Sequence, residues 1–428
     1  MSFCFVHAAD LHLDTPFEGL GSLSPELQQA LRDASLDAFD ALIETTIEHA
    51  AAFLLLAGDI YDGSARDVRA QLRLRNGLQR LSDRGIPTFI IHGNHDPVDE
   101  GWQAITQWPE HVHIFSDQEV ESTPVVIDGT CVATVHGMSY PTKHVTENLA
   151  LRYKRSPESG IHIGLLHANA GSSDEHANYS PCSIEDLQRA GMDYWALGHI
   201  HKRQVLRRSD PWIVYPGNLQ GRSPKPSEQG AKGALLVTVD GQTISEPEFL
   251  PLDRARFVEL TLAIDDLPDV ASLEGRLSSA ARSHQAENPD RGLLLRATIT
   301  GRGALHSDLG QPERVAGLLS ELRAWSEAEQ PFLWWDRLQV RTQPDLDRDV
   351  IRRRGDFTSD LLALIDNLRA DPDALSVFAA EQLPELQRAP ISQICRIDDG
   401  VIGDIESDLA QLLADAETIV LSQLESRA

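Results

Sequence analysis

The stretch Phe3-Cys-Phe-Val-His-Ala-Ala-Asp10-Leu-His12 sets a pattern that recurs through the first half of the chain. A short apolar run, typical of a buried strand, ends in a carboxylate and an imidazole. Further apolar runs cover residues 53–57, 88–91, 132–135, 161–166, 194–197 and 213–215. Amphipathic helical stretches separate several of these runs, so the pattern predicts a layered α/β sandwich and not an all-β fold. In such sheets functional residues gather at the strand ends.

Five separated fragments place polar residues at these strand ends. They are Asp10-Leu-His12, Gly58-Asp59, Gly93-Asn-His-Asp96, Leu166-His167 and Gly198-His-Ile-His201. Within the first and last fragments two polar residues stand two positions apart, so in an extended backbone their side chains leave on the same side and can converge on one centre. We expect the glycine that precedes several of these groups to let the chain turn sharply at the sheet edge.

The fragments supply carboxylate, imidazole and amide groups that suit divalent cations. The expected ligands are Asp10, His12, Asp59, Asn94, His167, His199 and His201. One cation does not need so many ligands, whereas two cations with about four to six ligands each, sharing a bridging carboxylate, use the set naturally. We expect Asp59 to be the bridge. Such a pair stabilises the entering and leaving oxygens of an in-line displacement, so the residues predict hydrolysis of a phosphate ester.

His95 lies between the expected ligand Asn94 and Asp96. This position suits a side chain that meets the scissile phosphate instead of a metal, where it stabilises charge or donates a proton to the leaving oxygen. We expect Asp96 to hold the His95 ring. His95 and Asp96 are therefore the predicted catalytic residues.

The composition narrows the class of protein further. The chain of 428 residues has a formal net charge of −27, 41% hydrophobic residues and 4 cysteines. The charge opposes broad adhesion to nucleic acid, so we expect any nucleic-acid contact to be local or assisted. No apolar run is long enough to span a membrane. The start of the chain lacks a basic signal-peptide region, and the cysteines are widely spaced, so we expect a cytoplasmic protein with reduced thiols.

Three segments differ in their patterns. We expect residues 1–250, which hold the motifs, to form the catalytic domain. Residues 251–345 alternate strand-like runs with helical stretches, which predicts a small α+β domain, and residues 346–428 are typical of helices. The last helix has a seam formed by Ile402, Ile405, Leu409, Leu412, Ala416 and Ile419. The seam packs on its own domain or docks a partner protein, and the sequence does not decide between the two.

The five fragments resemble the signature of the calcineurin-like metallophosphoesterase superfamily. Within it the chain is similar to the SbcD-type DNA repair exonucleases, and more narrowly to the YhaO-like branch. The branch motifs are His7-Ala-Ala-Asp-Leu-His-Leu-Asp14, Gly58-Asp-Ile-Tyr-Asp-Gly63, His176-Ala-Asn-Tyr-Ser-Pro-Cys182 and Tyr215-Pro-Gly-Asn-Leu-Gln-Gly-Arg222. The resemblance covers residues 1–250 well and the remainder only in layout. It implies a four-layer metallophosphoesterase β-sandwich flanked by helices, followed by a small α+β accessory domain and a helical C-terminal segment.

The resemblance also implies roles for individual residues and partners. One metal would be held by Asp10, His12, Asp59 and His201, and the other by Asp59, Asn94, His167 and His199. His95 matches the catalytic histidine of the family, and manganese, Mn²⁺, is its usual activating ion. The resemblance further implies DNA ends or single strands as substrate and an SMC-like coiled-coil ATPase as partner, docked partly through C-terminal helices. The sequence leaves open whether the chain forms a homodimer.

One position departs from the SbcD-type pattern. Those nucleases commonly carry a histidine three residues after the bridging Asp, where it helps to position DNA, and here that residue is Asp62. The departure favours phosphodiester hydrolysis in general over exonucleolytic cutting in particular. Its added negative charge lies next to an anionic substrate unless Asp62 serves a metal or a loop contact, and the loop contact is the commoner role of such a residue.

Two other functions use the same residues. A phosphatase or small-nucleotide phosphodiesterase would need the same metals, and the net charge of −27 favours it. The accessory domain and the helical tail favour the nuclease. A non-enzymatic scaffold for an ATPase partner fits least well, because no ligand type is missing.

Two groups of basic residues are candidates for contacts with DNA. Lys202, Arg203, Arg207 and Arg208 follow the last metal fragment and are the expected contacts to a phosphate backbone. The arginines between Arg66 and Arg84 crowd one helical region, and we expect them to form a solvated face.

Overall fold

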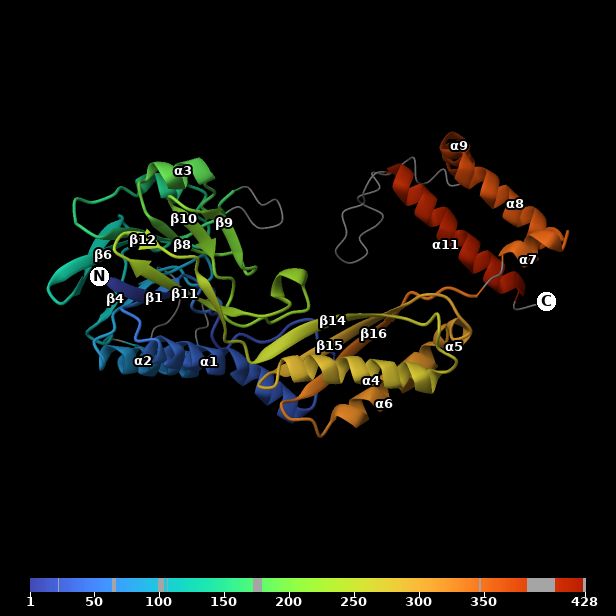
Figure 1. Cartoon of the computed structure of the whole chain (residues 1–428), viewed down its shortest axis with the longest axis horizontal. Coiled ribbons are helices and arrows are strands. Elements are labelled where there is room, and N and C mark those ends of the chain that lie inside the picture. Colours follow the sequence, from blue (N-terminus) through green and yellow to red (C-terminus); the bar gives the residue numbers. More distant parts are fainter. Residues whose placement is uncertain are drawn as a thin grey trace. The chain divides into compact units, whose positions relative to one another are not determined.

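The computed structural model describes residues 1–21, 23–63, 67–98, 104–105, 107–171, 179–345, 348–382 and 405–425 (Figure 1). Its contacts divide the chain into two compact units. The first contains Met1–Glu259, Ala281–Arg296 and Arg323–Asp336, and the second contains Leu260–Ala280, Ala297–Leu322 and Arg337–Ala428. No helix in the described ranges is long and apolar enough to cross a membrane. Cys4, Cys131 and Cys182 are free thiols, and Cys395 lies outside the described residues.

The first unit contains a seven-stranded sheet in the order β12-β11-β1-β2-β3-β4, with β13 also paired to β11. Its strands are β1 (Ser2–Ala8), β2 (Leu54–Ala57), β3 (Thr88–Ile91), β4 (Val112–Ile114), β11 (Gly233–Asp240), β12 (Thr243–Ile244) and β13 (Glu248–Pro251). From β1 to β4 neighbouring strands are parallel, with Leu55 of β2 opposite His7 of β1 and Phe89 of β3. Helices α1 (Pro25–Glu48) and α2 (Val68–Ser82) cover one face of this sheet.

A second sheet of six strands has the order β5-β6-β7-β8-β10-β9. Its strands are β5 (Glu121–Ile127), β6 (Thr130–Gly137), β7 (Ile161–His167), β8 (Tyr194–Gly198), β9 (Gln204–Arg208) and β10 (Trp212–Tyr215). The neighbours β6, β7, β8 and β10 are parallel. The 3₁₀ helix η1 (Leu149–Arg152) and helix α3 (Ile184–Arg189) pack on its outer face.

Side-chain alternation along the central strands builds three apolar layers. On β1, Val6 packs toward α1 and α2, whereas Phe5 packs between the two sheets. There the Phe5 ring meets the edge of Tyr194 of β8, with ring centroids 5.4 Å apart. On β8 the next residue, Trp195, packs toward α3, and its Nε1 donates to Leu187 O at 2.9 Å. The order helix, sheet, sheet, helix confirms the predicted four-layer α/β sandwich.

The rest of the chain adds a small sheet and a set of helices. Strands β14 (Ala255–Ala263), β15 (Gly292–Thr300) and β16 (Leu333–Val340) form a three-stranded sheet, accompanied by α4 (Val270–Glu287), α5 (His306–Leu309) and α6 (Pro312–Ser326). Helices α7 (Arg348–Arg353), α8 (Phe357–Ala370), α9 (Pro372–Gln382) and α11 (Ile405–Glu425) follow. The predicted α+β and helical segments are therefore present, and the boundaries 1–250, 251–345 and 346–428 stay predictions.

Helix α11 packs on α8 and α9 through a stripe that differs from the predicted seam. Leu421 is buried against Leu362, and Glu417 contacts Arg348 and Arg369. In the seam, Leu412 and Ile419 are 52% and 58% exposed. Ile402 and the side chain of Ile405 lie outside what the structure describes. Leu412, Ala416 and Ile419 of the seam are therefore left exposed by the described chain, and Leu409 is partly covered.

Candidate metal centre

The candidate site forms where the carboxyl ends of parallel strands from both sheets meet, in the loops after β1, β2, β3, β7 and β8. Hydrogen bonds tie these loops together. Asp10 N donates to Gly58 O at 3.1 Å and His12 N donates to Asp59 O at 3.0 Å. His199 N donates to Asp10 Oδ1 at 3.0 Å, which links the two sheets. The sheet edge therefore collects fragments that are far apart in the sequence.

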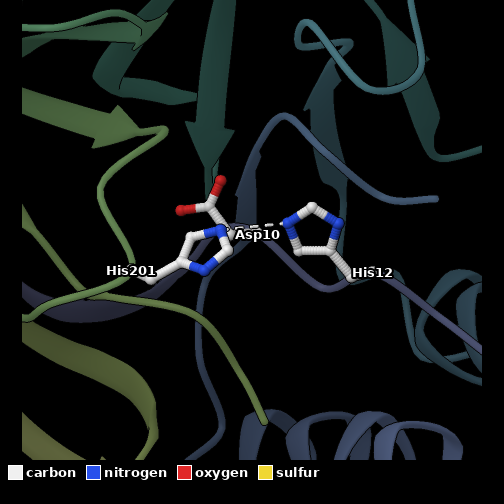
Figure 2. A group of neighbouring side chains, drawn as sticks. All are labelled: Asp10, His12 and His201. Atoms are coloured by element: carbon white, nitrogen blue, oxygen red, sulfur yellow. Dashed lines mark hydrogen bonds between the residues drawn. The ribbon is translucent and has the colours of Figure 1, made fainter. Parts of the chain in front are cut away.

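Asp10, His12 and His201 form one cluster, in which the potential ligand atoms all lie within 4.8 Å of one another (Figure 2). The rings of His12 and His201 are arranged edge-on, with His12 Nε2 3.1 Å from His201 Nε2. Asp10 and His12 are each 1% exposed. Buried carboxylates are normally paired or bound to a metal, and imidazole with carboxylate is a donor set that divalent transition ions accept. The cluster therefore fits a cation.

A second cluster joins Asp10 and Asp59 to His167. His167 Nε2 lies 3.4 Å from Asp59 Oδ2 and 3.0 Å from Asn94 Oδ1. His167 Nδ1 lies 2.9 Å from Ala57 O, and a donated hydrogen bond there leaves Nε2 free to accept a metal. These atoms form a second mixed nitrogen and oxygen donor set.

Asp59 stands between the two clusters. Its Oδ2 lies 3.4 Å from His167 Nε2 and 3.9 Å from His12 Nε2, as a bridging carboxylate would. His199 lies beside the second cluster, with its ring centroid 5.3 Å from that of His167. The structure thus brings all seven predicted ligand residues to one edge, and their role as ligands stays a prediction.

The buried charges of the two clusters depend on one another. Burial raises the pKa of Asp10 to about 6. Burial acts on Asp59 in the same direction, but the charge of His167 and its hydrogen bond hold the pKa of Asp59 well below its usual range. Against burial, Asp59 and Asp10 raise the pKa of His167 to about 9. The protonated His167 ring thus supplies positive charge that a bound cation would supply instead.

His95 lies at the mouth of the site, with its side chain 37% exposed. His95 N donates to Asp59 Oδ1 at 2.9 Å, and His95 Nδ1 lies 2.6 Å from Asp62 Oδ1. Burial lowers the pKa of His95, but the hydrogen bond to Asp62 and the charges of Asp59 and Asp62 together outweigh burial and raise the pKa above the ordinary value. A histidine held by a carboxylate and open to solvent can meet a substrate.

The predicted contact between Asp96 and the His95 ring is wrong. Asp96 Oδ1 accepts from Gly93 N at 2.8 Å, and Asp96 Oδ2 lies 3.2 Å from His92 Nδ1. Consecutive residues of a tight loop project in different directions, so Asp96 stabilises the loop from inside while His95 faces the mouth. Asp62 takes the expected place of Asp96 at the His95 ring, so the loop contact expected of Asp62 is a contact with this histidine.

Glu228 is a residue of this site that the sequence motifs did not indicate. It lies in the 3₁₀ helix η2 (Pro226–Glu228), where Oε1 contacts His201 Nδ1 and Oε2 accepts from Asn218 Nδ2 at 2.8 Å. A carboxylate on the second ring nitrogen of a histidine fixes the tautomer that leaves Nε2 for a metal. Opposing burial, the hydrogen bond and charge of His201 lower the pKa of Glu228 to about 2. Its only sequence signal is that it follows the motif ending at Arg222.

A cleft of about 560 Å³ opens onto the site, and its basic lining residues are Lys143, Arg222 and Lys225. The sequence predicted other basic residues, namely Lys202, Arg203, Arg207 and Arg208, and these do not line it. Arg208 contacts Glu246, and the Arg203 guanidinium lies 4.3 Å from the centroid of the Phe249 ring.

Three arginines of α2, namely Arg69, Arg73 and Arg80, pair with acidic residues of α1 while their side chains stay 37–41% exposed, so the expected solvated face is present and carries ion pairs. Arg73 Nη2 lies 3.0 Å from Asp37 Oδ1, and Arg69 contacts Asp33 in the same way. Arg66 lies outside the described residues. This repeated pairing offsets the positive charge of these arginines, which makes α2 a poor surface for DNA.

Parts of this chain are similar in sequence to known proteins. Residues 4–203 match the family described as calcineurin-like phosphoesterase, and residues 257–343 match the family described as the middle domain of metallophosphoesterase YhaO. The protein described as uncharacterized metallophosphoesterase YhaO, from Bacillus subtilis (strain 168), is 42% identical over 241 residues, 56% of this chain and 58% of the relative. The chain thus spans less than two thirds of that relative.

Similarity extends at lower identity to other proteins. The DNA double-strand break repair protein Mre11 of Thermoplasma acidophilum is 27% identical over 313 residues, which are 69% of this chain and 77% of the relative. A solved structure of a dimetal phosphatase from Danio rerio is 11% identical, covers 55% of this chain and 92% of its own, and superposes with a TM-score of 0.35.

Proposed function

We propose that this chain is a two-metal phosphodiesterase that hydrolyses DNA. The premise is that residues 4–203 form a calcineurin-like metallophosphoesterase domain, as their motifs predicted. The observation that supports this most is the meeting of the predicted ligands around Asp59, with the partly exposed His95 beside them. Similarity to the Mre11 repair protein supports DNA as the substrate.

The donor set fits two divalent cations, for which we propose Mn²⁺. Asp10, His12, Asp59 and His201 would hold one, and Asp59, Asn94, His167 and His199 the other. When bound, such cations supply Lewis-acid stabilisation of charge on phosphoryl oxygens.

The side chains of the site have separate tasks. Asp62 accepts a hydrogen bond from His95 Nδ1 and thereby leaves Nε2 to face a leaving oxygen. Glu228 orients His201 in the same manner, and Ala57 O orients His167. In this arrangement His95 donates the proton that the leaving oxygen needs, and the buried carboxylates stay ionised behind it.

Assays of the purified chain with Mn²⁺ test this function. We expect cleavage of labelled single- and double-stranded DNA, with cyclic nucleotides and p-nitrophenyl phosphate as rival substrates. His95→Ala should lower kcat roughly 10²- to 10⁴-fold, and Asp59→Asn should remove metal-dependent activity. His284→Ala, which changes an exposed histidine on α4, is the matched control.

Other outcomes of these assays would select a different function. Cleavage of the monoester alone, lost in His95→Ala, would identify a phosphatase. No hydrolysis of any substrate, together with a cellular function that survives Asp59→Asn, would identify a scaffold.

We further propose that an SMC-like coiled-coil ATPase binds the C-terminal helices. Leu412 and Ile419 of α11 are 52% and 58% exposed, and Phe357 of α8 is 70% exposed. Uncovered apolar side chains of this kind mark interaction sites. The double variant Leu412→Asp with Ile419→Asp should lose co-purification with the ATPase, whereas Leu151→Asp on the catalytic domain, where Leu151 is 61% exposed, should keep it. Equal recovery of the ATPase with both variants would contradict this proposal. Homodimer formation and a cytoplasmic location stay predictions.

A further inference from the structure

Arg222, the last residue of the motif that begins at Tyr215, has no part in the metal clusters. Its backbone is fixed at both polar groups, because Arg222 N donates to Glu228 Oε2 at 2.9 Å and Arg222 O accepts from Glu18 N at 2.9 Å. Its side chain lines the cleft and is 13% exposed. The structure therefore holds a nearly buried cation at a defined position beside the site.

The Arg222 guanidinium has unused hydrogen-bond donors. A guanidinium has five N–H donors, and among the described residues this one makes a single hydrogen bond, from Nη1 to Asp62 Oδ2 at 3.2 Å. Its Nε is buried and has no partner within the described chain. Burying a charged group with unmet donors is unfavourable unless an anion completes it. The planar fork of arginine matches phosphate, whose oxygens accept two parallel hydrogen bonds.

Asp62 connects Arg222 with the proposed catalytic histidine. Its Oδ2 accepts the hydrogen bond from Arg222, and its Oδ1 lies 2.6 Å from His95 Nδ1. One carboxylate therefore fixes the positions of both side chains. A phosphate group whose leaving oxygen meets His95 can place a second oxygen on Arg222.

Two more cations face the same cleft. Lys143 and Lys225 line it, and neither forms an ion pair with another described residue. The chain has a net charge of −27, and its arginine-rich helix α2 pairs with acidic residues of α1. The cleft also carries the carboxylates of Glu18, Asp59, Asp62 and Glu228, and the last three contact histidines of the site. Lys143, Lys225 and the unmet donors of Arg222 are left to bind a ligand with several negative charges.

We propose that Arg222 binds a non-bridging oxygen of the scissile phosphodiester and that Lys143 and Lys225 bind the phosphates next to it. The cleft then selects a polynucleotide strand over a phosphomonoester. This inference rests on the proposed phosphodiesterase function and names the contacts that select its substrate.

Binding to the metal-free chain tests the contacts without hydrolysis. The probe is a fluorescein-labelled ten-residue oligothymidylate in EDTA, followed by anisotropy over a series of salt concentrations. Arg222→Gln should weaken binding roughly 10- to 100-fold. The double variant Lys143→Gln with Lys225→Gln should flatten the slope of log affinity against log salt by about 0.7 for each lost contact. Arg207→Gln, outside the cleft, is the matched control and should bind like the wild type.

Hydrolysis with Mn²⁺ separates the two kinds of contact. Arg222→Gln should lower kcat/KM for the oligonucleotide and for the p-nitrophenyl ester of thymidine 5′-phosphate, a diester with a single phosphate. The double lysine variant should lower kcat/KM only for the oligonucleotide. Arg222→Lys keeps the charge without the fork and should lie between the wild type and Arg222→Gln.

The two proposals fail in different ways. If the wild-type chain hydrolyses no phosphodiester, the proposed function is wrong, while the binding series still decides the role of Arg222. If Arg222→Gln or Arg222→Lys binds the oligonucleotide as tightly as the wild type, the inference is overturned. Thermal melting of each variant shows whether a loss of binding reflects unfolding, and Arg222→Lys then gives the decisive comparison.

Discussion

Asp62 has a role in the candidate site that its position in the sequence did not indicate. Beside an anionic substrate its negative charge is unfavourable, and the sequence indicated only a loop contact. In the structure His95 and Arg222 share that charge, each at one carboxylate oxygen. The same contacts act on Asp62, because the hydrogen bond from His95 lowers its pKa. The carboxylate thus stays ionised where it orients two groups that face the substrate.

Asp62→Asn should lower kcat roughly 10- to 100-fold, because the amide still contacts the His95 ring but lacks the negative charge of the carboxylate. The Asp62 hydrogen bond raises the pKa of His95. A proton donor is active below its pKa, so the loss of rate at high pH should begin at lower pH in Asp62→Asn than in the wild type. The pH profile of kcat with Mn²⁺ measures this shift. Asp128→Asn, in the turn between β5 and β6, should change neither quantity, and an unmoved high-pH limb in Asp62→Asn would contradict the assigned role.

At the scale of the elements, the loops after the strands determine where the ligands lie. The spacing of Asp10 and His12 predicted an extended backbone for both residues. Their φ angles are 49° and 43°, and that of Asp59 is 51°, which is the left-handed region. Residues other than glycine occupy it at a cost of about 1–3 kcal/mol each, mostly at functional sites. The ligands converge because tight hydrogen-bonded turns aim them, and the spacing of two residues does not by itself explain the convergence.

Two glycines of these loops are needed for close approach. A Cβ on Gly93 would lie 2.3 Å from Asp59 Oδ1, and one on Gly198 would lie 1.8 Å from Ala57 O. Neither glycine has a positive φ, so glycine is needed at these two positions for the close approach and not for the expected sharp turn. Gly58, with a φ of 89°, does make such a turn.

The buried strands were predictable because their apolar runs are continuous. The prediction for residues 88–91 matches β3 (Thr88–Ile91). Residues 251–345 were predicted to alternate strand-like runs with helical stretches, and α6 (Pro312–Ser326) and β16 (Leu333–Val340) are among the elements found there. Helix α1 (Pro25–Glu48) was not predicted at all, although it covers a sheet.

The candidate site was predictable as a set of residues but not as a network of contacts. The motifs give the ligand residues. Their common location was predictable because each motif ends a strand and parallel strands end at one edge of a sheet. Side-chain direction within a loop does not follow from spacing, which is why Asp96 was expected where Asp62 lies. Glu228 could not be found from His201, because the two are 27 residues apart and meet only in the fold.

At the scale of the whole molecule, the net charge of −27 contrasts with the three cations Lys143, Arg222 and Lys225 that line the cleft beside its carboxylates. Repulsion between an acidic surface and DNA weakens binding everywhere except where local cations and metals offset it. Under the proposed function, such a chain would bind DNA at its site and poorly elsewhere.

Metal binding should stabilise the whole catalytic fold, because the buried carboxylates Asp10 and Asp59 lie close together only in the native state. Mn²⁺ at a hundred times its Kd should add about 2.7 kcal/mol per site, which for a domain of this size raises Tm by roughly 5–10 °C. Calorimetry of EDTA-treated chain with and without Mn²⁺ measures the change, and Asp59→Asn should lose most of it. His284→Ala should keep the full increase. A wild-type Tm that does not respond to Mn²⁺ would mean that these clusters hold no cation.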